Sequence, residues 1–279
     1  MLTAAQTRLA VWGDPIAHSK SPRLHAAAYR VLGLDWTYDR RRVDAESFAQ
    51  TLDALDATWR GLSLTYPLKV RAFEAASSRD RRAELTGAVN TLVLDASGPL
   101  GCNTDVGGIV AALGDLGIVT APSARIVGAG ATAASALVAL AELDARRVEV
   151  VARRPEAVGP LAALGDTLGV AVTAASFTDP FTAMDVTIAT LPGEAEVGDA
   201  VADALAGSGG PLLDVVYGHW PTALSAAWDR AGGASASGSG MLLHQALLQV
   251  RLFVAGDVEA ALDDEADVLA AMRAALVED

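Results

Sequence analysis

One short segment constrains the fold of this chain more than any other. The apolar residues that follow Arg125 lead directly into Gly128-Ala-Gly-Ala-Thr-Ala133, and a long alanine-rich stretch then continues to about Leu143. A strand, a glycine-rich turn and a helix in this order predict a unit in which the helix packs back onto a parallel sheet. Gly128 permits the tight turn, and Ala133 permits close packing of the helix.

The residues before this segment alternate between short apolar runs and amphipathic stretches. The expected strands are 9–13, 36–39, 61–65 and 89–94. The expected helices are 22–32, 45–55, 67–76 and one that residues 103–105 lead into and Gly114 ends. Capping residues support the first helix, because Ser21 is a plausible N-cap, Pro22 suits the first helical position and Gly33 suits a left-handed C-cap. Pro67 is expected to open the helix that follows the third strand.

The residues after the glycine-rich turn continue the alternation. Further strands are expected at 148–151, 185–189 and 212–216, and helices at 241–253 and 258–276, beyond a Gly- and Ser-rich stretch at 232–240. Strands alternating with helices predict an α/β fold with open sheets. We expect two domains: an N-terminal α/β substrate domain over residues 1–106, completed by 238–279 as the C-terminal helices return to it, and a Rossmann-type nucleotide-binding domain over 107–237.

Composition excludes several classes of protein. A net charge of -13 argues against nucleic acid as a partner, because binding a phosphate backbone requires a basic face. The apolar stretch 109–119 is broken by Asp115 and is too short to span a membrane, and Met1–Arg8 lack the features of a secretory signal. The single Cys102, expected to be a buried thiol, fits a reducing compartment. We therefore expect a cytoplasmic protein, with a homodimer left open.

The glycine-rich turn is typical of a dinucleotide site. Gly130 lets the backbone approach a pyrophosphate, and the following helix N-terminus offers N–H groups and a partial positive charge. The expected phosphate-binding residues are Gly128, Ala129, Gly130, Ala131 and Thr132. The next strand ends in Ala152-Arg153-Arg154, with no carboxylate for a ribose 2'-hydroxyl, and two arginines can bracket a 2'-phosphate. This pattern favours NADP(H) over NAD. A turn that only packs and a solvated arginine pair are the alternatives.

Four further segments carry a specific resemblance. They are Gly13-Asp-Pro-Ile-Ala-His-Ser-Lys-Ser-Pro22, Thr65-Tyr-Pro-Leu-Lys69, Gly87-Ala-Val-Asn-Thr91 and Asn103-Thr-Asp105. With the later Gly240-Met-Leu and Gln245, the set resembles the shikimate dehydrogenase family and spans nearly the whole chain. The resemblance implies NADPH-dependent, reversible reduction of 3-dehydroshikimate to shikimate, in the shikimate pathway of aromatic amino-acid (chorismate) biosynthesis.

The resemblance also implies roles for individual residues. Lys69 and Asp105 match the proton-transfer pair of the family, and only Lys20 and Lys69 are lysines among 21 basic residues. Ser19 and Ser21 match ligands of the substrate carboxylate. The other substrate contacts implied are Thr65, Asn90, Tyr217 and Gln245, and the residues implied around the nicotinamide are Val215, Gly238 and Met241.

Each of these residues also has a plain structural interpretation. Lys69 could be a solvated lysine and Asp105 an N-cap, and Ser21 could serve only as a cap. Tyr217 could be an aromatic residue at a strand end, Gln245 a polar residue on a helix face, and Met241 part of the core.

The sequence departs from the family pattern at two places. Ser63 stands where the family usually has asparagine, which puts one substrate hydrogen bond in doubt. Ile188-Ala-Thr-Leu-Pro192 departs from the common asparagine-alanine-threonine pattern in a loop expected to contact the cofactor. No spacing of His18, His25, His219 and His244 suits a metal, so none is expected. Two rivals stay open: a quinate/shikimate dehydrogenase that uses NAD, and a catalytically silent NADP-binding regulatory protein.

Overall fold

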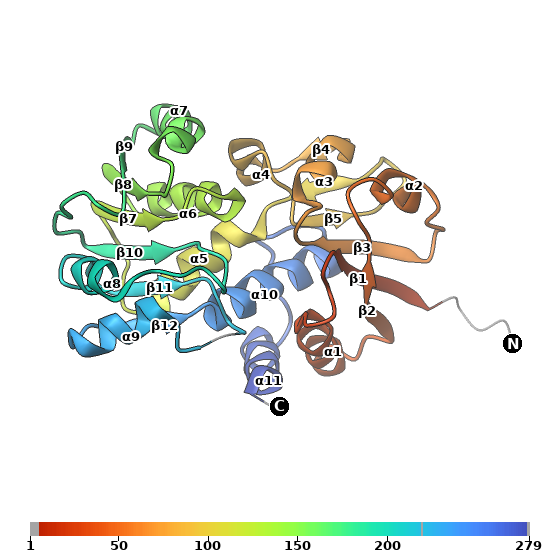
Figure 1. The fold of residues 1–279 in the computed structure, drawn as a ribbon. Helices are drawn as coiled ribbons and strands as arrows, with labels where there is room; N and C mark the ends of the chain where they lie inside the picture. The colour runs from red at the N-terminus through yellow and green to blue at the C-terminus, as the bar shows by residue number, and fades with distance from the viewer. Residues whose placement is uncertain (1–5, 219, 278–279) are drawn as a thin grey trace, which may run out of the picture. The chain divides into compact units, whose positions relative to one another are not determined.

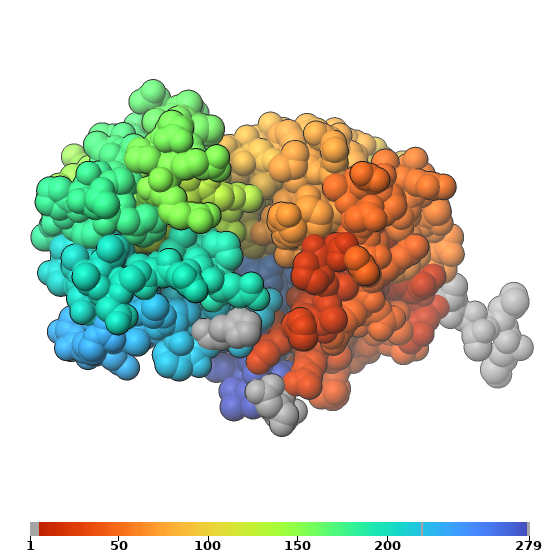
Figure 2. Space-filling view, in the orientation of Figure 1, coloured from red at the N-terminus to blue at the C-terminus, as the bar shows by residue number. Residues whose placement is uncertain are grey.

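A computed structural model describes residues 6–218 and 220–277, so the start of Met1–Arg8 and His219 lie outside the described residues. The chain divides into two compact units, which we call unit 1 (Met1–Thr104 with Gln245–Asp279) and unit 2 (Asp105–His244). The dividing points fall within helices α5 (Thr104–Asp115) and α10 (Ser239–Ala255). The domain limits drawn from the sequence, 106/107 and 237/238, stay a prediction. Unit 1 is drawn mainly in red to orange and blue, and unit 2 mainly in green to light blue (Figures 1 and 2).

Unit 1 is built on a mixed six-stranded sheet in the order β2-β1-β3-β5-β6-β4. The strands are β1 (Thr7–Gly13), β2 (Trp36–Arg42), β3 (Trp59–Leu64), β4 (Ser78–Arg79), β5 (Thr91–Val93) and β6 (Leu100–Cys102). Strands β2, β1 and β3 are parallel, whereas β5 runs antiparallel to both β3 and β6. All of β1 from Leu9 onward is buried, as expected for a strand covered on both faces.

Helices cover both faces of this sheet. They are α1 (Ser21–Val31), α2 (Phe48–Asp53), α3 (Lys69–Ala75), α4 (Arg81–Thr86), the later part of α10, and α11 (Glu265–Val277). Trp12, Phe48 and Leu62 share a core with α3 on one face. On the other face α11 packs against α1, and His25 of α1 contacts the ring of Phe253 from α10. The C-terminal helices thus belong to the N-terminal fold.

Unit 2 is built on a wholly parallel six-stranded sheet in the order β12-β11-β10-β7-β8-β9 (Figure 1). The strands are β7 (Ser123–Val127), β8 (Arg147–Val151), β9 (Ala171–Ala175), β10 (Val186–Ala189), β11 (Leu212–Asp214) and β12 (Ser235–Ser237). The helical segments that follow α5 are α6 (Ala131–Glu142), η1 (Pro155–Val158), α7 (Gly159–Leu168), α8 (Asp199–Ala206) and α9 (Ala223–Arg230). The strands run outward from β7 in both directions, which is the order of a Rossmann fold. The predicted α/β class is therefore confirmed.

Several local predictions are corrected by the structure. Ser21 is not an N-cap but the first residue of α1, which begins after Lys20. Pro67 does not open α3, since the helix begins two residues later at Lys69, with Leu68 as its N-cap. The expected helix at 45–55 is shorter, and the one at 258–276 begins later. The stretch 232–240 contains the edge strand β12.

Other elements had no counterpart in the sequence-based assignment. They are β4, α4, β6, η1, α7, β9, α8 and α9. All of them except α7 have eight residues or fewer, and short elements leave few positions in which a periodic pattern can appear. Gly33 does adopt the predicted left-handed conformation, with φ of 64°, and Cys102 is buried as predicted.

Candidate active site

One edge of the unit 1 sheet gathers polar residues that are far apart in the sequence. The parallel strands β1 and β3 end there, at Gly13 and Leu64. Because β5 is antiparallel to β3, its beginning lies at the same edge, where Thr91 pairs with Ser63 and with Cys102. The loops that carry Ser19, Thr65, Asn90 and Thr104 are thereby brought to a single edge.

Asn90 lies at the centre of this group and is 2% exposed. Its Oδ1 accepts hydrogen bonds from the backbone N–H of Thr104 at 2.9 Å and from the Thr91 hydroxyl at 2.8 Å. Its Nδ2 donates to Thr104 Oγ1 at 2.9 Å, and to Gln245 Oε1 at 3.5 Å. The sequence-predicted residues Asn90 and Gln245 are therefore brought together, and Thr104, which had no assigned role, links them.

Lys69 and Thr65 follow β3 on the same edge. The backbone N–H of Thr65 donates to Trp12 O at 3.0 Å, which ties the loop to β1. Lys69 is the first residue of α3, and its carbonyl accepts the N–H of Val89 at 3.0 Å. The main chain of Lys69 is thus held beside the residue that precedes Asn90. The side chains of Thr65 and Lys69 are partly exposed, as a substrate contact and a proton donor must be.

Asp105 is the residue after Thr104 and lies in the first turn of α5. It is 6% exposed, so its carboxyl group is largely removed from bulk water. A carboxylate in the first turn of a helix is stabilised by the helix dipole. Asp105 thus combines a buried position with the end of α5 that favours negative charge.

Ser19 and Ser21 lie at the N-terminus of α1, where the backbone favours an anion. Ser19 Oγ accepts the backbone N–H of Ser21 at 3.3 Å, so Ser19 takes part of the capping function predicted for Ser21. Ser21 is 6% exposed, and its hydroxyl hydrogen bonds to Tyr38.

A buried polar cluster that sequence reasoning missed lies beneath this edge. Tyr38 donates to Ser63 Oγ at 2.6 Å, and Ser63 donates to Gln249 Oε1 at 2.8 Å. Gln249 is 2% exposed and lies one helical turn after Gln245 on α10. Two glutamines four residues apart lie on the same face of a helix, and this spacing was the available signal. Ser63 is 4% exposed and hydrogen bonds to protein groups. The presence of serine in place of the family's asparagine therefore affects this buried cluster.

The glycine-rich turn of unit 2 lies between β7 and α6. Gly128 has φ of 114°, and a Cβ there would lie 2.7 Å from Thr190 Oγ1, so this position requires glycine. A Cβ on Gly130 would meet no protein atom within 4 Å. The fold therefore does not require glycine at position 130, whereas a phosphate group close to the backbone would. Ala133 is fully buried, as expected from its packing role.

The arginine pair lies at the same edge as the glycine-rich turn. Strand β8 pairs with β7, and the N–H of Gly128 donates to Val151 O at 2.8 Å. Ala152 is buried, while Arg153 and Arg154 are exposed directly after the strand. The helix N-terminus, the open space over Gly130 and two exposed guanidinium groups fit a dinucleotide that carries a 2'-phosphate.

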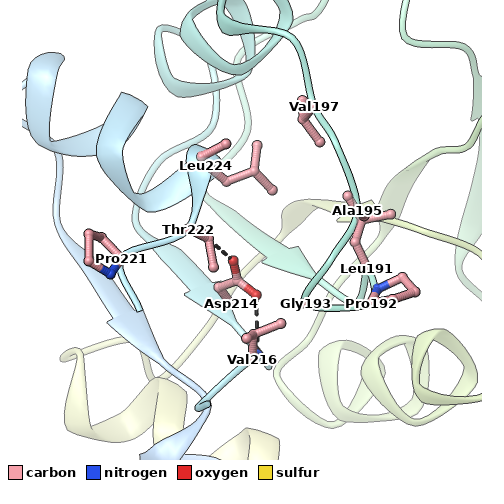
Figure 3. A pocket seen from close by; sticks show the side chains of 11 residues that line it. Leu191, Pro192, Gly193, Ala195, Val197, Asp214, Val216, Pro221, Thr222 and Leu224 are labelled. Carbon is pink, nitrogen blue, oxygen red and sulfur yellow. Dashed lines mark hydrogen bonds between the residues drawn. The ribbon is translucent and has the colours of Figure 1, made fainter. Parts of the chain in front are cut away.

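A cavity of about 180 Å³ opens beyond the ends of β10 and β11 (Figure 3). Its lining includes Leu191 and Pro192 after β10, Asp214 at the end of β11, and Val216 after that strand. Asp214 is held by the Thr222 hydroxyl at 2.8 Å and the N–H of Val216 at 3.2 Å, and burial raises the pKa of its carboxyl group. The loop after β11 is thus fixed at the carboxyl edge of the sheet, where ligands of open α/β folds bind.

The remaining predicted residues of unit 2 lie near this edge. Val215 is partly exposed, Tyr217 is 37% exposed and Met241 is 8% exposed. A Cβ on Gly238 would lie 2.0 Å from Val215 O, so the close approach of two backbones requires glycine here. The roles predicted for these residues toward substrate and nicotinamide stay predictions.

Unit 2 has a Rossmann sheet with a glycine-rich turn and two exposed arginines after β8. Unit 1 carries a lysine and several side chains that can hydrogen bond to hydroxyl groups. These features together define a dinucleotide-dependent oxidoreductase. Residues 11–92 match the model of the shikimate dehydrogenase substrate binding domain. The chain is 36% identical to a shikimate dehydrogenase (NADP(+)) of Methylobacterium radiotolerans, over 88% of this chain and 90% of that protein. It belongs to the shikimate dehydrogenase family, as the resemblance of its motifs predicted.

Solved structures agree with this assignment. A crystal structure of Mycobacterium tuberculosis shikimate dehydrogenase is 40% identical, with a TM-score of 0.85, and the match covers 96% of this chain and 99% of that one. The Thermus thermophilus shikimate 5-dehydrogenase, determined in complex with NADP(H) and shikimate, is 28% identical, with a TM-score of 0.80 over 97% of this chain and 100% of that one.

Proposed function

We propose that the protein is an NADP-dependent shikimate dehydrogenase that interconverts 3-dehydroshikimate and shikimate. The observation that carries the proposal is the gathering of Ser21, Thr65, Asn90, Gln245 and Lys69 around one edge of the unit 1 sheet, since a cyclic polyol acid needs several hydroxyl-binding groups and an anion site together. In the reducing direction the ketone carbon gains a hydride and the ketone oxygen gains a proton.

NADP(H) would be held by residues 128–132 at its pyrophosphate and by Arg153 and Arg154 at its 2'-phosphate. When bound, NADPH supplies the hydride. We propose that Val215, Gly238 and Met241 line the nicotinamide. Ala152 is a further proposed cofactor contact, through its backbone, because it lies between the strand and the arginines.

Lys69 is the proposed proton donor. Its ammonium group would donate a proton to the oxygen that develops negative charge as the ketone is reduced, and the neutral amine would take that proton back in the reverse direction. Asp105 would stabilise the ammonium form as the second member of the pair. Arginine could not serve here, because a guanidinium group does not release its proton in this pH range.

The other residues would orient the substrate. Ser19 and Ser21, at the start of α1, are proposed to bind its carboxylate. Thr65, Asn90 and Gln245 are proposed to bind ring hydroxyls, with Tyr217 as a further contact. A substrate held at several points presents its carbon in one orientation, and such positioning supplies much of the rate acceleration of enzymes.

The test is the absorbance of reduced nicotinamide with purified protein, shikimate or quinate, and NADP or NAD. We expect turnover of shikimate with NADP. The Lys69→Ala variant should lose about 10²- to 10⁴-fold in kcat, the range for loss of a general acid, and keep its affinity for NADP. The matched control is Arg71→Ala, which removes an exposed cation of the same helix that pairs with Glu74 at 2.9 Å; its kcat should be unchanged.

The same assay separates the rivals. Turnover of quinate with NAD would replace the proposal by a quinate/shikimate dehydrogenase. Tight NADP binding with no turnover of either acid would favour a regulatory protein. Equal loss of kcat in Lys69→Ala and Arg71→Ala would remove the proton-transfer role from Lys69.

We further propose a cytoplasmic enzyme of the chorismate route that uses small molecules and not nucleic acid as ligands. Among the described helices, none has the length and apolar character to cross a membrane. A homodimer is the oligomeric state to test, by light scattering of the purified protein.

A further inference from the structure

Two hydrogen bonds to the side chain of Asn90 have a direction that the chemistry of their partners determines. A backbone N–H can only donate, so the atom of Asn90 that lies 2.9 Å from the Thr104 N–H must be the oxygen Oδ1. The Thr91 hydroxyl lies 2.8 Å from the same oxygen, and it must therefore donate its only proton to Asn90. One main-chain contact thus fixes both the orientation of the Asn90 amide and the direction of the Thr91 hydroxyl.

The direction of the hydrogen bond between Thr91 and Gln249 follows. Because the Thr91 hydroxyl has used its proton, it can only accept from the group 3.0 Å away, and this must be Gln249 Nε2. The same nitrogen donates to the backbone oxygen of Asn90 at 3.3 Å. Gln249 is thereby joined to both the main chain and, through Thr91, the side chain of Asn90.

The other end of Gln249 is held as firmly. Its Oε1 accepts from Ser63 at 2.8 Å and lies 3.3 Å from His25 Nε2. Burial lowers the pKa of His25 to about 3, so the ring is neutral near pH 7 and carries one proton. Its Nδ1 lies 3.1 Å from the Tyr29 hydroxyl, which can donate to it. The proton of His25 is therefore on Nε2, directed at Gln249.

We infer that Gln249 is a positioning residue for substrate recognition: through Thr91 it keeps Oδ1 of Asn90 turned into the protein, so that Asn90 meets a substrate hydroxyl as a hydrogen-bond donor. The proton available for this is the one that reaches Gln245 Oε1 only at 3.5 Å, since the other is donated to Thr104 Oγ1 at 2.9 Å. The inference rests on the proposed function, because it presumes a hydroxylated substrate at Asn90. It implies that the substrate oxygen bound by Asn90 acts as a hydrogen-bond acceptor. Without the Thr91 hydroxyl, Asn90 Oδ1 would keep the N–H of Thr104 at 2.9 Å and the Thr104 hydroxyl at 3.2 Å, but it would lose its shortest hydrogen bond, at 2.8 Å. The amide would then be less firmly oriented.

Thr91→Val is the decisive variant, because valine keeps the shape of the side chain and removes only the hydroxyl that joins Gln249 to Asn90. We expect KM for shikimate to rise roughly five- to tenfold, as for loss of one buried hydrogen bond, with kcat and KM for NADP changed by less than about twofold, since neither the proton donor nor the cofactor site is touched. Gln249→Met should raise KM by a similar factor. The double variant should show little further rise in KM, because both changes break the same hydrogen-bonded link from Gln249 through Thr91 to Asn90.

The matched control is Thr187→Val in unit 2. Thr187 is fully buried, and its hydroxyl donates to Gly209 O at 2.7 Å, so this variant also loses one buried hydroxyl. It should lose a comparable amount of stability and leave KM for shikimate unchanged. An unchanged KM in a folded Thr91→Val protein would overturn the inference, as would an equal rise in KM for Thr187→Val.

A second readout does not depend on turnover. The side-chain amide of Asn90 gives its own ¹⁵N–¹H₂ NMR signals, and these should shift in Thr91→Val and in Gln249→Met but not in Thr187→Val. If the wild type turned over no shikimate, the proposed function would fail, and these signals alone would decide the orientation of Asn90. Unshifted Asn90 signals in both Thr91→Val and Gln249→Met would sink the inference even in an active enzyme.

Discussion

The two sheets of this protein build their sites in different ways. In unit 2 every strand is parallel, and the groups expected to hold the cofactor follow the first two strands, in segments 128–133 and 152–154. In unit 1 the sheet is mixed, and the site edge combines loops after β1, β3 and β6, the start of β5 and one face of α10. The phosphate-binding groups of unit 2 thus lie in two short segments after neighbouring strands, while the site of unit 1 exists only after long-range pairing.

The buried polar groups of the two units also differ, since one set is charged and the other is neutral. Unit 2 buries a charged pair, in which Arg125 Nε donates to Glu149 Oε1 at 2.6 Å across β7 and β8. Unit 1 buries a neutral hydrogen-bonded chain that includes Tyr38, Ser63 and Gln249. A buried charge without a partner is far more costly than a neutral group without one. We therefore expect single substitutions in the polar core to lower the stability of unit 2 more than that of unit 1.

The largest expected effect tests this difference directly. Arg125→Met leaves Glu149 without its cation and should lower the free energy of unfolding by about 3 to 5 kcal/mol, the usual cost of breaking a buried pair. Arg125 also donates to Thr182 O and to the Ser208 hydroxyl, so several partners are lost together. Urea denaturation followed by circular dichroism measures the change.

Two controls accompany the Arg125 variant. Adding Glu149→Leu to it should recover most of the loss, because the unpaired carboxylate is removed. Arg230→Ala, which breaks the half-exposed pair with Asp203, should cost less than about 1 kcal/mol. If Arg125→Met cost no more than Arg230→Ala, the proposed contrast between the two cores would be wrong.

Sequence reasoning succeeded where local chemistry determines structure. The turn at Gly128 was predictable because a positive φ and close contact with the next loop both demand glycine, and the flanking strand and helix were visible as apolar runs. The short β6 had no such signal, since Leu100, Gly101 and Cys102 acquire their strand conformation only by pairing with β5 and β4. Family resemblance supplied Asn90 and Gln245, but their connection through Thr104 required the fold.

The buried polar cluster of unit 1 is a second case in which the sequence did not reveal which residues contact one another. Ser63 was noted as a departure from the family pattern, but its partners Tyr38 and Gln249 lie 25 and 186 residues away in the sequence. Pairings over such separations leave no periodic signal. The departure could be recognised from the sequence, whereas its physical meaning could not.

An intermediate effect is expected at the arginine tip of unit 2. Replacing Arg153 or Arg154 by serine should weaken NADP binding by about 10- to 100-fold, the range for a hydrogen bond between charged groups. NAD binding should change little, because NAD lacks the 2'-phosphate. Fluorescence titration of both cofactors gives the ratio. Arg147→Ser is the control, since Arg147 lies at the opposite end of β8, and an equal loss there would mean that net charge and not a 2'-phosphate contact is responsible.

The effect that is smallest near pH 7 is a pH dependence specific to the neutral core of unit 1, and it grows as the pH falls. Burial lowers the pKa of His25 from 6.5 to about 3. The folded state therefore binds a proton less readily than the unfolded state, and the stability associated with neutral His25 is complete above pH 6.5 and is lost as the pH falls from 6.5 toward 3. Relative to His25→Gln, the wild type should lose about 1.4 kcal/mol for each pH unit below 6.5. Asp80, whose pKa is raised by burial, titrates in both proteins, so its contribution cancels in the difference. Parallel stability curves for the two proteins would show that His25 is protonated as easily in the fold as in the unfolded chain. The direction of the hydrogen bond from His25 to Gln249 would then have to be assigned anew.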